Sequence, residues 1–293
     1  MRIAELLHED RLDALPKGDD GSLLSARTAV YVLDQVVTYD YTAPIRNVRQ
    51  RLMIVPRPRH GDQTRVAHRL DVATDDAPME RIGRRADEFG NDVVDIQAAT
   101  VAQSLRFSLR AVVRRDRQRP PMHDWSAPVP TTTKLTEPDD ALRAAARRLA
   151  GPDVSAIAER MCAHVHESFT YRHGDTGVRT TAAEAWAGQA GVCQDMAHVM
   201  IAMCSSLGVA SRYVSGHLVG DGASHAWVEV FDPHRRTVVS VDPTHARRTD
   251  LRYMVTAVGR DYGDVAPTSG TYVSRHGKGH LAVRKRIRLA DVA

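Results

Sequence analysis

The residues best suited to chemistry are a cysteine, a histidine and an aspartate in the second half of the chain, Cys193, His225 and Asp242. An attack by sulfur on an amide needs a deprotonated sulfur, a base that returns a proton to the leaving amine, and a third group that orients the base. We assign these three roles to Cys193, His225 and Asp242, in that order. The oxyanion would meet the backbone N–H of Cys193, and the sequence does not identify a second donor.

Cys193 lies where a loop is expected to become a helix. Gly188 and Gly191 favour a turn before it. The apolar residues that follow have the three-and-four spacing of an amphipathic helix, and Gly208 would end that helix. Unpaired backbone N–H groups and the helix dipole favour an anion in the first turn, so this position favours a nucleophilic thiolate.

His225 and Asp242 are expected on neighbouring strands. Residues 224–231 and 237–242 are rich in valine and aromatic side chains, and a turn at Asp232 and Pro233 separates them. Antiparallel pairing of the two strands would bring His225 and Asp242 together.

Several residues have simpler interpretations. His198 falls on a different face of the Cys193 helix, so we interpret it as structural, and His217 is a weaker candidate base. A metal site built from His198, His217 and His225 lacks a close-spaced pair of ligands, and we expect no metal. Cys162 belongs to an apolar helix face and is interpreted as a core residue.

Composition excludes several classes of protein. The chain has 293 residues, 43% apolar and 26% charged, which is ordinary for a globular protein. It contains no run of about 18 apolar residues, so we expect no membrane span. The first ten residues lack the apolar run of a signal peptide, which predicts a cytoplasmic location.

Charge and cysteine usage narrow the choice further. The net charge is +4, the basic residues are spread along the chain, and aromatic residues make up 5%, so we do not expect nucleic-acid binding. Three cysteines without a C-x-x-C pair form neither a disulfide framework nor a structural zinc site.

The pattern divides the chain into four parts. Residues 1–27 form an N-terminal extension, 28–113 a β-rich domain, 114–138 a linker rich in arginine and proline, and 139–293 the catalytic domain. Short strands are expected in the second part, among them 29–33, 36–41 and 105–112. The alternation within 105–112 places Leu105, Phe107, Leu109 and Ala111 inward. This spacing of strands is typical of a β-sandwich.

The last part is expected to be α+β. Helices are predicted at 141–149, from Asp153 to about Phe169, and at 182–186, before the Cys193 helix. Strands follow at 210–218, 224–231 and 237–242, with a last strand at 281–289. Helices followed by an antiparallel run of strands favour an α+β fold.

The chain resembles the bacterial transglutaminase-like family. The resemblance covers about residues 37 to 289 and rests on GVCQDMAH (191–198), RYVSG (212–216), SHAWVEV (224–230), VDPT (241–244) and GRDYGDVAP (259–267). In the first half, YDYTAP (39–44) and DEFGN (87–91) resemble the β-rich domain that precedes the core in this family. The strand before Asp242 departs from the family in lacking a tryptophan.

The resemblance implies a papain-like α+β core with a Cys-His-Asp triad, which falls on Cys193, His225 and Asp242. We therefore predict a cysteine-dependent enzyme that hydrolyses an amide or peptide bond through a thioester, without a cofactor, acting on a peptide or small amide. Transfer of the acyl group to an amine is the alternative reaction. A non-catalytic peptide-binding module of the same fold is the alternative of another class. The oligomeric state is left open.

Overall fold

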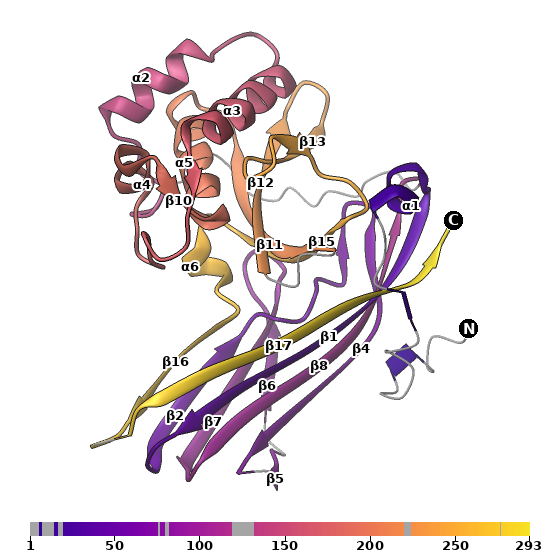
Figure 1. The fold of residues 1–293 in the computed structure, drawn as a ribbon, viewed down its shortest axis with the longest axis vertical. Helices are drawn as coiled ribbons and strands as arrows, with labels where there is room; N and C mark the ends of the chain where they lie inside the picture. The colour runs from indigo at the N-terminus through magenta and orange to yellow at the C-terminus, as the bar shows by residue number, and fades with distance from the viewer. Residues whose placement is uncertain are drawn as a thin grey trace.

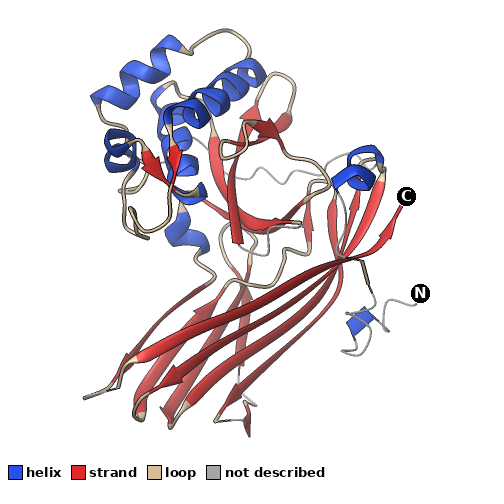
Figure 2. Cartoon of the chain, in the orientation of Figure 1, coloured by secondary structure: helices blue, strands red, loops and turns tan. Residues whose placement is uncertain are grey.

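The computed structural model describes residues 6–7, 15–16, 20–75, 77–79, 82–118, 132–219, 224–275 and 277–293. Most of the predicted N-terminal extension and residues 119–131 of the predicted linker lie outside this set, as does the glycine-rich segment 220–223 that precedes the His225 strand. The described chain forms a helix-and-sheet part, at the top of Figure 1, above a part built from long strands (Figures 1 and 2).

The helices, apart from short α1 and α6, lie in the middle of the sequence. Their bounds are α1 Asp20–Ser25, α2 Asp140–Arg148, α3 Val154–Ser168, α4 Ala182–Gly188, α5 Cys193–Ser206 and α6 Tyr262–Val265.

Strands make up most of residues 28–116 and of the sequence after α5, and the two-residue strands β9 and β10 lie among the helices. Their bounds are β1 Thr28–Tyr41, β2 Ile45–Leu52, β3 Arg59–His60, β4 Gln63–Thr74, β5 Ala77–Pro78, β6 Ile82–Ala86, β7 Asp92–Val101, β8 Ser104–Asp116, β9 Thr170–Tyr171, β10 Ala190–Gly191, β11 Ser211–Leu218, β12 Ser224–Asp232, β13 Thr237–Asp242, β14 Arg247–Arg248, β15 Tyr253–Gly259, β16 Thr268–Val273 and β17 Gly279–Val292.

The long strands form a sandwich of two antiparallel sheets. One sheet has the order β17-β1-β8-β4-β3, with β5 beside β4, and the other has the order β16-β2-β7-β6. The four residues of β8 that were predicted to point inward are at most 1% exposed and belong to the core between the sheets: Leu105, Phe107, Leu109 and Ala111. The β-rich character and the inward face of β8 are therefore confirmed.

The C-terminal strands correct the predicted division of the chain. We expected residues 139–293 to form one catalytic domain, but β17 pairs along its length with β1, and β16 pairs with β2. Ile287 and Leu289 of β17 are 8% and 4% exposed and join the core of the sandwich. Alternation of apolar residues predicts that a strand exists and which face it buries, but not its partner strand.

Boundaries near β1 and β8 also differ from the expectation. The predicted strands 29–33 and 36–41 are one continuous strand, β1, because Asp34 lies within the sheet and accepts a hydrogen bond from Arg110 at 2.8 Å. Strand β8 runs to Asp116 and so takes up the beginning of the predicted linker.

The second part is the predicted α+β unit. Its antiparallel sheet has the order β14-β13-β12-β11-β15, and one continuous core joins that sheet to helices α2, α3, α4 and α5. The helices begin where capping residues predicted them. The side chains of Asp139 and Asp153 accept from backbone N–H groups of α2 and α3, and Thr181 forms a capping box with Glu184 at α4.

The two parts are in direct contact. Val219, Leu251 and Met254, which follow or belong to the strands of the α+β sheet, pack in the core of the sandwich. Within the described residues, no helix is both long and apolar enough to cross a bilayer.

Substitution of Phe107 by alanine should lower the free energy of unfolding by about 3–5 kcal/mol, because it leaves a cavity between the two sheets. Arg106→Ala is the matched control, since its side chain is exposed on the opposite face of the same strand, and it should change stability by less than about 0.5 kcal/mol. Urea denaturation measures both. Equal losses in the two variants would contradict the assignment of the inner face.

Candidate active site

The predicted nucleophile is the first residue of α5. Cys193 follows the N-cap Val192, whose extended backbone turns the chain into the helix. Its thiol is half-buried, whereas Cys162 and Cys204 are buried. The structure therefore places Cys193 at a helix N-terminus, as the spacing of apolar residues predicted.

The buried side chain of Asp195 holds the chain segment that leads into Cys193. Asp195 Oδ2 accepts from the backbone N–H of Val192 at 2.8 Å and from Thr176 Oγ1 at 2.6 Å. A Cβ atom at Gly191 would lie 2.6 Å from the same oxygen, so only glycine leaves room for this side chain. Asp195 thus ties the helix start to the preceding loop, and burial raises its pKa even though the hydrogen bonds oppose that shift.

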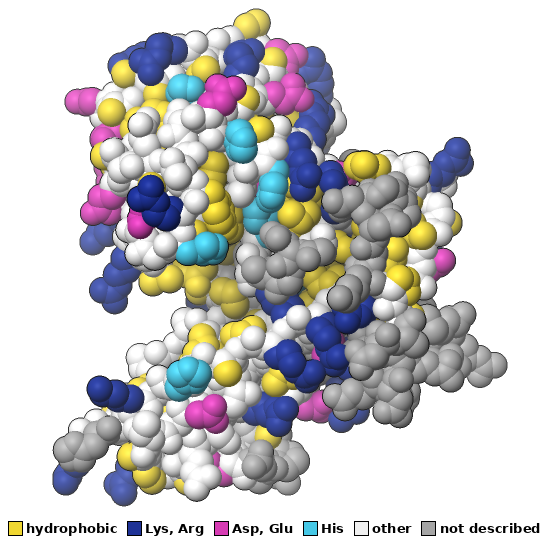
Figure 3. All heavy atoms as spheres, in the orientation of Figure 1, with side chains coloured by type: hydrophobic (Ala, Val, Ile, Leu, Met, Phe, Trp, Pro, Cys, Tyr) yellow, Lys and Arg dark blue, Asp and Glu magenta, His cyan; other side chains and the backbone are white. Residues whose placement is uncertain are grey.

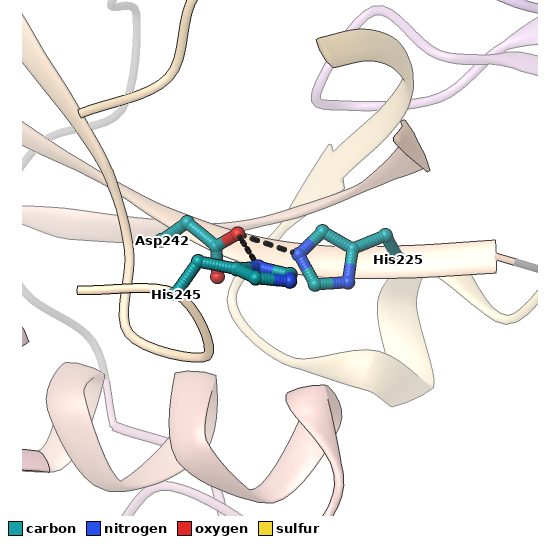
Figure 4. A group of neighbouring side chains, drawn as sticks. All are labelled: His225, Asp242 and His245. Carbon is teal, nitrogen blue, oxygen red and sulfur yellow. Dashed lines mark hydrogen bonds and ion pairs between the residues drawn. The ribbon is translucent and has the colours of Figure 1, made fainter. Parts of the chain in front are cut away.

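His225 and Asp242 meet as the predicted strand pair requires. Strands β12 and β13 are antiparallel, with Val228 opposite Val241, and this register brings the start of β12 to the end of β13. His225 Nε2 lies 2.8 Å from Asp242 Oδ2 (Figure 4). Both residues are buried, at 5% and 0% exposed.

Asp242 is the most heavily hydrogen-bonded side chain of the site. Its Oδ2 also accepts from His245 Nδ1 at 2.7 Å and from the Tyr253 hydroxyl at 2.7 Å, and its Oδ1 accepts from the backbone N–H of Thr244 at 2.9 Å. Burial raises the pKa of Asp242, but these hydrogen bonds outweigh it and hold the pKa well below its usual range. The carboxylate is therefore ionised at neutral pH.

The histidine carries the complementary charge. Burial lowers the pKa of His225, but hydrogen bonds with Asp242 and with Cys193 outweigh this and raise the pKa to about 9. The imidazolium therefore lies between the carboxylate of Asp242 and the sulfur of Cys193. The three residues assigned from the sequence are thus linked in the order Cys193, His225, Asp242, while their catalytic roles stay a prediction.

Aromatic rings shield this chain of contacts. The Trp227 ring stacks on His225 with 6.2 Å between ring centroids, and the Tyr253 ring lies 6.1 Å from His225. Trp227 and Tyr253 are both 1% exposed. Apolar cover of this kind strengthens the hydrogen bond between His225 and Asp242, because water does not compete for it.

The other candidate residues lie outside the site. His198 is fully buried, and its Nε2 accepts from the backbone N–H of Tyr262 at 3.1 Å, as expected of a structural histidine. His217, the weaker candidate base, lies 3.2 Å from Thr256 Oγ1 on β15. Burial raises the pKa of the Cys162 and Cys204 thiols to about 12.

Two side chains that contact Asp242, His245 and Tyr253, were not predicted from the sequence. In the described residues, the histidine and carboxylate atoms with metal-ligand spacing belong to His225, Asp242 and His245, within 4.8 Å of one another, and not to the set considered from the sequence. The shared oxygen of Asp242 already accepts three hydrogen bonds at 2.7–2.8 Å, and a cation held by this group would have to replace the two that come from the histidines. The arrangement fits an orienting carboxylate better than a metal site.

Comparison with known proteins places the chain in a family. Residues 143–243 match the model of the transglutaminase-like superfamily, and residues 31–114 match that of the bacterial transglutaminase-like N-terminal region. An uncharacterized protein of Mycobacterium tuberculosis is 30% identical over 286 residues, which cover 85% of this chain and 89% of that protein. The chain belongs to the transglutaminase-like superfamily.

Two further proteins are similar to this chain at lower sequence identity. An uncharacterized Mycobacterium leprae protein is 27% identical over 263 residues, covering 81% of this chain and 91% of its own length. Among solved structures, a candidate cysteine protease from Cytophaga hutchinsonii superposes with a TM-score of 0.68 at 19% identity, covering 89% of this chain and 98% of that one. The superposition shows that the transglutaminase-like fold extends over both parts of the molecule.

Iodoacetamide should alkylate Cys193 alone in the folded protein at pH 6–7, because burial keeps Cys162 and Cys204 as protonated, inaccessible thiols. Peptide mapping by mass spectrometry identifies the modified residue, and the same reaction in urea provides the control in which all three react. Equal labelling of the three cysteines only after unfolding would instead favour a binding module without a reactive thiolate.

Proposed function

We propose that this transglutaminase-like protein is a thiol hydrolase that cleaves an amide or peptide bond through a thioester acyl-enzyme. The observation that carries the proposal is the hydrogen bond of 2.8 Å between His225 and a fully buried Asp242, with Cys193 as the other partner of the imidazole. Nucleophile, base and orienting carboxylate are the parts that this chemistry needs.

Acylation follows from the charges of the site. The Cys193 thiolate attacks the carbonyl carbon, and the backbone N–H at the start of α5 stabilises the oxyanion. The C–N bond breaks as the His225 imidazolium gives its proton to the leaving amine. The products are a thioester on Cys193 and a neutral His225 that still bonds to Asp242.

Deacylation reverses the proton transfer. Neutral His225 takes a proton from water, the resulting hydroxide adds to the thioester carbon, and the C–S bond breaks to release a carboxylic acid and the thiolate. His225 again carries the proton at the end of the cycle. Hydrolysis is our choice because water needs no second binding site; the proposal includes a peptide or small amide as substrate and a cytoplasmic location.

Substitution of Cys193 by alanine should abolish turnover of a peptide library. The change in the free energy of unfolding should be no more than about 1–2 kcal/mol, since the side chain is small and half-buried.

Asp242→Asn should lower kcat by about two to four orders of magnitude with a smaller effect on folding, because the amide favours the wrong tautomer of the imidazole. Turnover is followed by mass spectrometry and stability by urea denaturation; native rates in either variant would remove that residue from the mechanism.

The rate of acylation should fall as pH rises through about 9. His225 must be protonated to serve the leaving amine, and its raised pKa keeps that proton in place below this value. This fall in rate is measured from the pH profile of kcat/KM with a reactive amide substrate. A rate that already declines between pH 6 and 7 would mean that His225 titrates as an ordinary histidine.

The acyl acceptor is tested by product mass. A peptide library incubated with the protein should yield free carboxylic acids both with and without added cadaverine. Cys193→Ala serves as the control for uncatalysed reaction. Products whose mass increases by the bound amine would assign the protein to amide synthesis instead of hydrolysis.

A further inference from the structure

The free edge of the catalytic sheet is covered by side chains of the sandwich. Strand β15 is the last strand of its sheet, next to β11. Gln63 of β4 donates from Nε2 to the carbonyl of Val255 at 2.7 Å and accepts from its N–H at 2.8 Å. Asn91 makes the same pair of bonds with Val258, at 2.7 and 2.9 Å. An edge strand has no neighbouring strand on its outer side, so its backbone groups there lack partners. The two amide side chains supply those partners.

The residues just before Val255 are held in the same way. The hydroxyl of Tyr31 in β1 donates to the carbonyl of Leu251 at 2.5 Å. Arg115 of β8 donates to the carbonyl of Asp250 at 3.2 Å and also to that of Tyr253. Gln63 is 1% and Tyr31 0% exposed, so these bonds are shielded from water.

Tyr253 lies in the middle of this held segment and reaches the active site. Its hydroxyl donates to Asp242 Oδ2 at 2.7 Å and accepts from Arg247 Nε at 2.8 Å. Burial and the neighbouring Asp242 raise the pKa of Tyr253, so the hydroxyl keeps its proton and acts as the donor. The phenol therefore links the backbone held by the sandwich to the carboxylate behind His225.

We propose that Tyr253 is a positioning residue for Asp242, and that the N-terminal sandwich fixes Tyr253 by holding the start of strand β15. The sandwich thereby sets the orientation of the Asp242 carboxylate and, through it, of the His225 ring. The proposal rests on the proposed function, because it assigns a role in the same triad.

Removal of the Tyr253 hydroxyl should raise the pKa of His225. Asp242 loses one of its donors, its charge is less neutralised, and it holds the proton of His225 more tightly. The titratable and charged groups around this carboxylate come from five elements or the turns beside them: Cys193 of α5, Cys162 of α3, His225 of β12, His245 after β13 and Arg247 of β14.

The test is the pH dependence of alkylation of Cys193 by iodoacetamide in Tyr253→Phe. The native profile should contain an upper inflection near pH 9, where His225 loses its proton. In the variant this inflection should move to higher pH, corresponding to about three- to tenfold tighter proton binding. Tyr39→Phe is the matched control, because its hydroxyl lies 2.7 Å from Thr268 within the sandwich, away from the triad, and it should keep the native profile.

The contribution of the sandwich is tested by Gln63→Leu alone and combined with Tyr253→Phe. The single variant should move the inflection in the same direction by a smaller factor, and the double variant should match Tyr253→Phe. Gln63→Glu, which keeps the size and the acceptor, replaces Gln63→Leu if the latter fails to fold by circular dichroism. Additive shifts, or a native profile in a folded Gln63 variant, would overturn the link to the sandwich.

The two proposals fail in different ways. A native protein without selective alkylation of Cys193 would contradict the proposed function itself. Selective alkylation with the upper inflection present in the native protein but unmoved in folded Tyr253→Phe would leave the hydrolase standing and overturn the positioning role alone.

Discussion

The candidate active site depends on one ionised carboxylate that is removed from water. Asp242 is fully buried, and a buried charge is tolerated only when polar partners replace its solvent. Four donors do so here, from His225, His245, Tyr253 and the backbone of Thr244. Because the carboxylate stays ionised, His225 keeps its proton at neutral pH and places a positive charge beside the sulfur of Cys193. In the proposed function, this arrangement prepares Cys193 as the nucleophile and His225 as the acid before a substrate binds.

The fold supplies this environment from distant parts of the sequence. The helix of Cys193 packs on one face of the sheet that carries His225 and Asp242, so sulfur and imidazole meet where helix and sheet touch. The free edge of that sheet is held by Gln63 and Asn91 of the sandwich. The sandwich is in turn completed by β16 and β17, to which the chain returns after the sheet that carries His225 and Asp242 (Figure 1). Figure 3 shows the resulting surface, with histidines beside the notch between the two parts.

Local chemistry explains what could be predicted. The turn before Cys193, the apolar spacing after it and the short turn between β12 and β13 are all features of neighbouring residues, and they placed the helix start and the facing ends of the two strands correctly. The long-range features were beyond such reasoning. Nothing near Tyr253 shows that its hydroxyl reaches Asp242, and an alternating strand such as β17 does not identify β1 as its partner. The contact of His245 with Asp242 was easier to predict, since His245 follows Asp242 by three residues in a tight turn that brings the two side chains together.

His225 is an imidazolium at neutral pH because hydrogen bonds with Asp242 and Cys193 hold its proton. Titration of the imidazole by ¹H–¹⁵N NMR, with His225→Gln used to assign the resonance, measures this directly. The ring should stay protonated at both nitrogens up to about pH 9. Titration near the ordinary value of about 6.5 would contradict it.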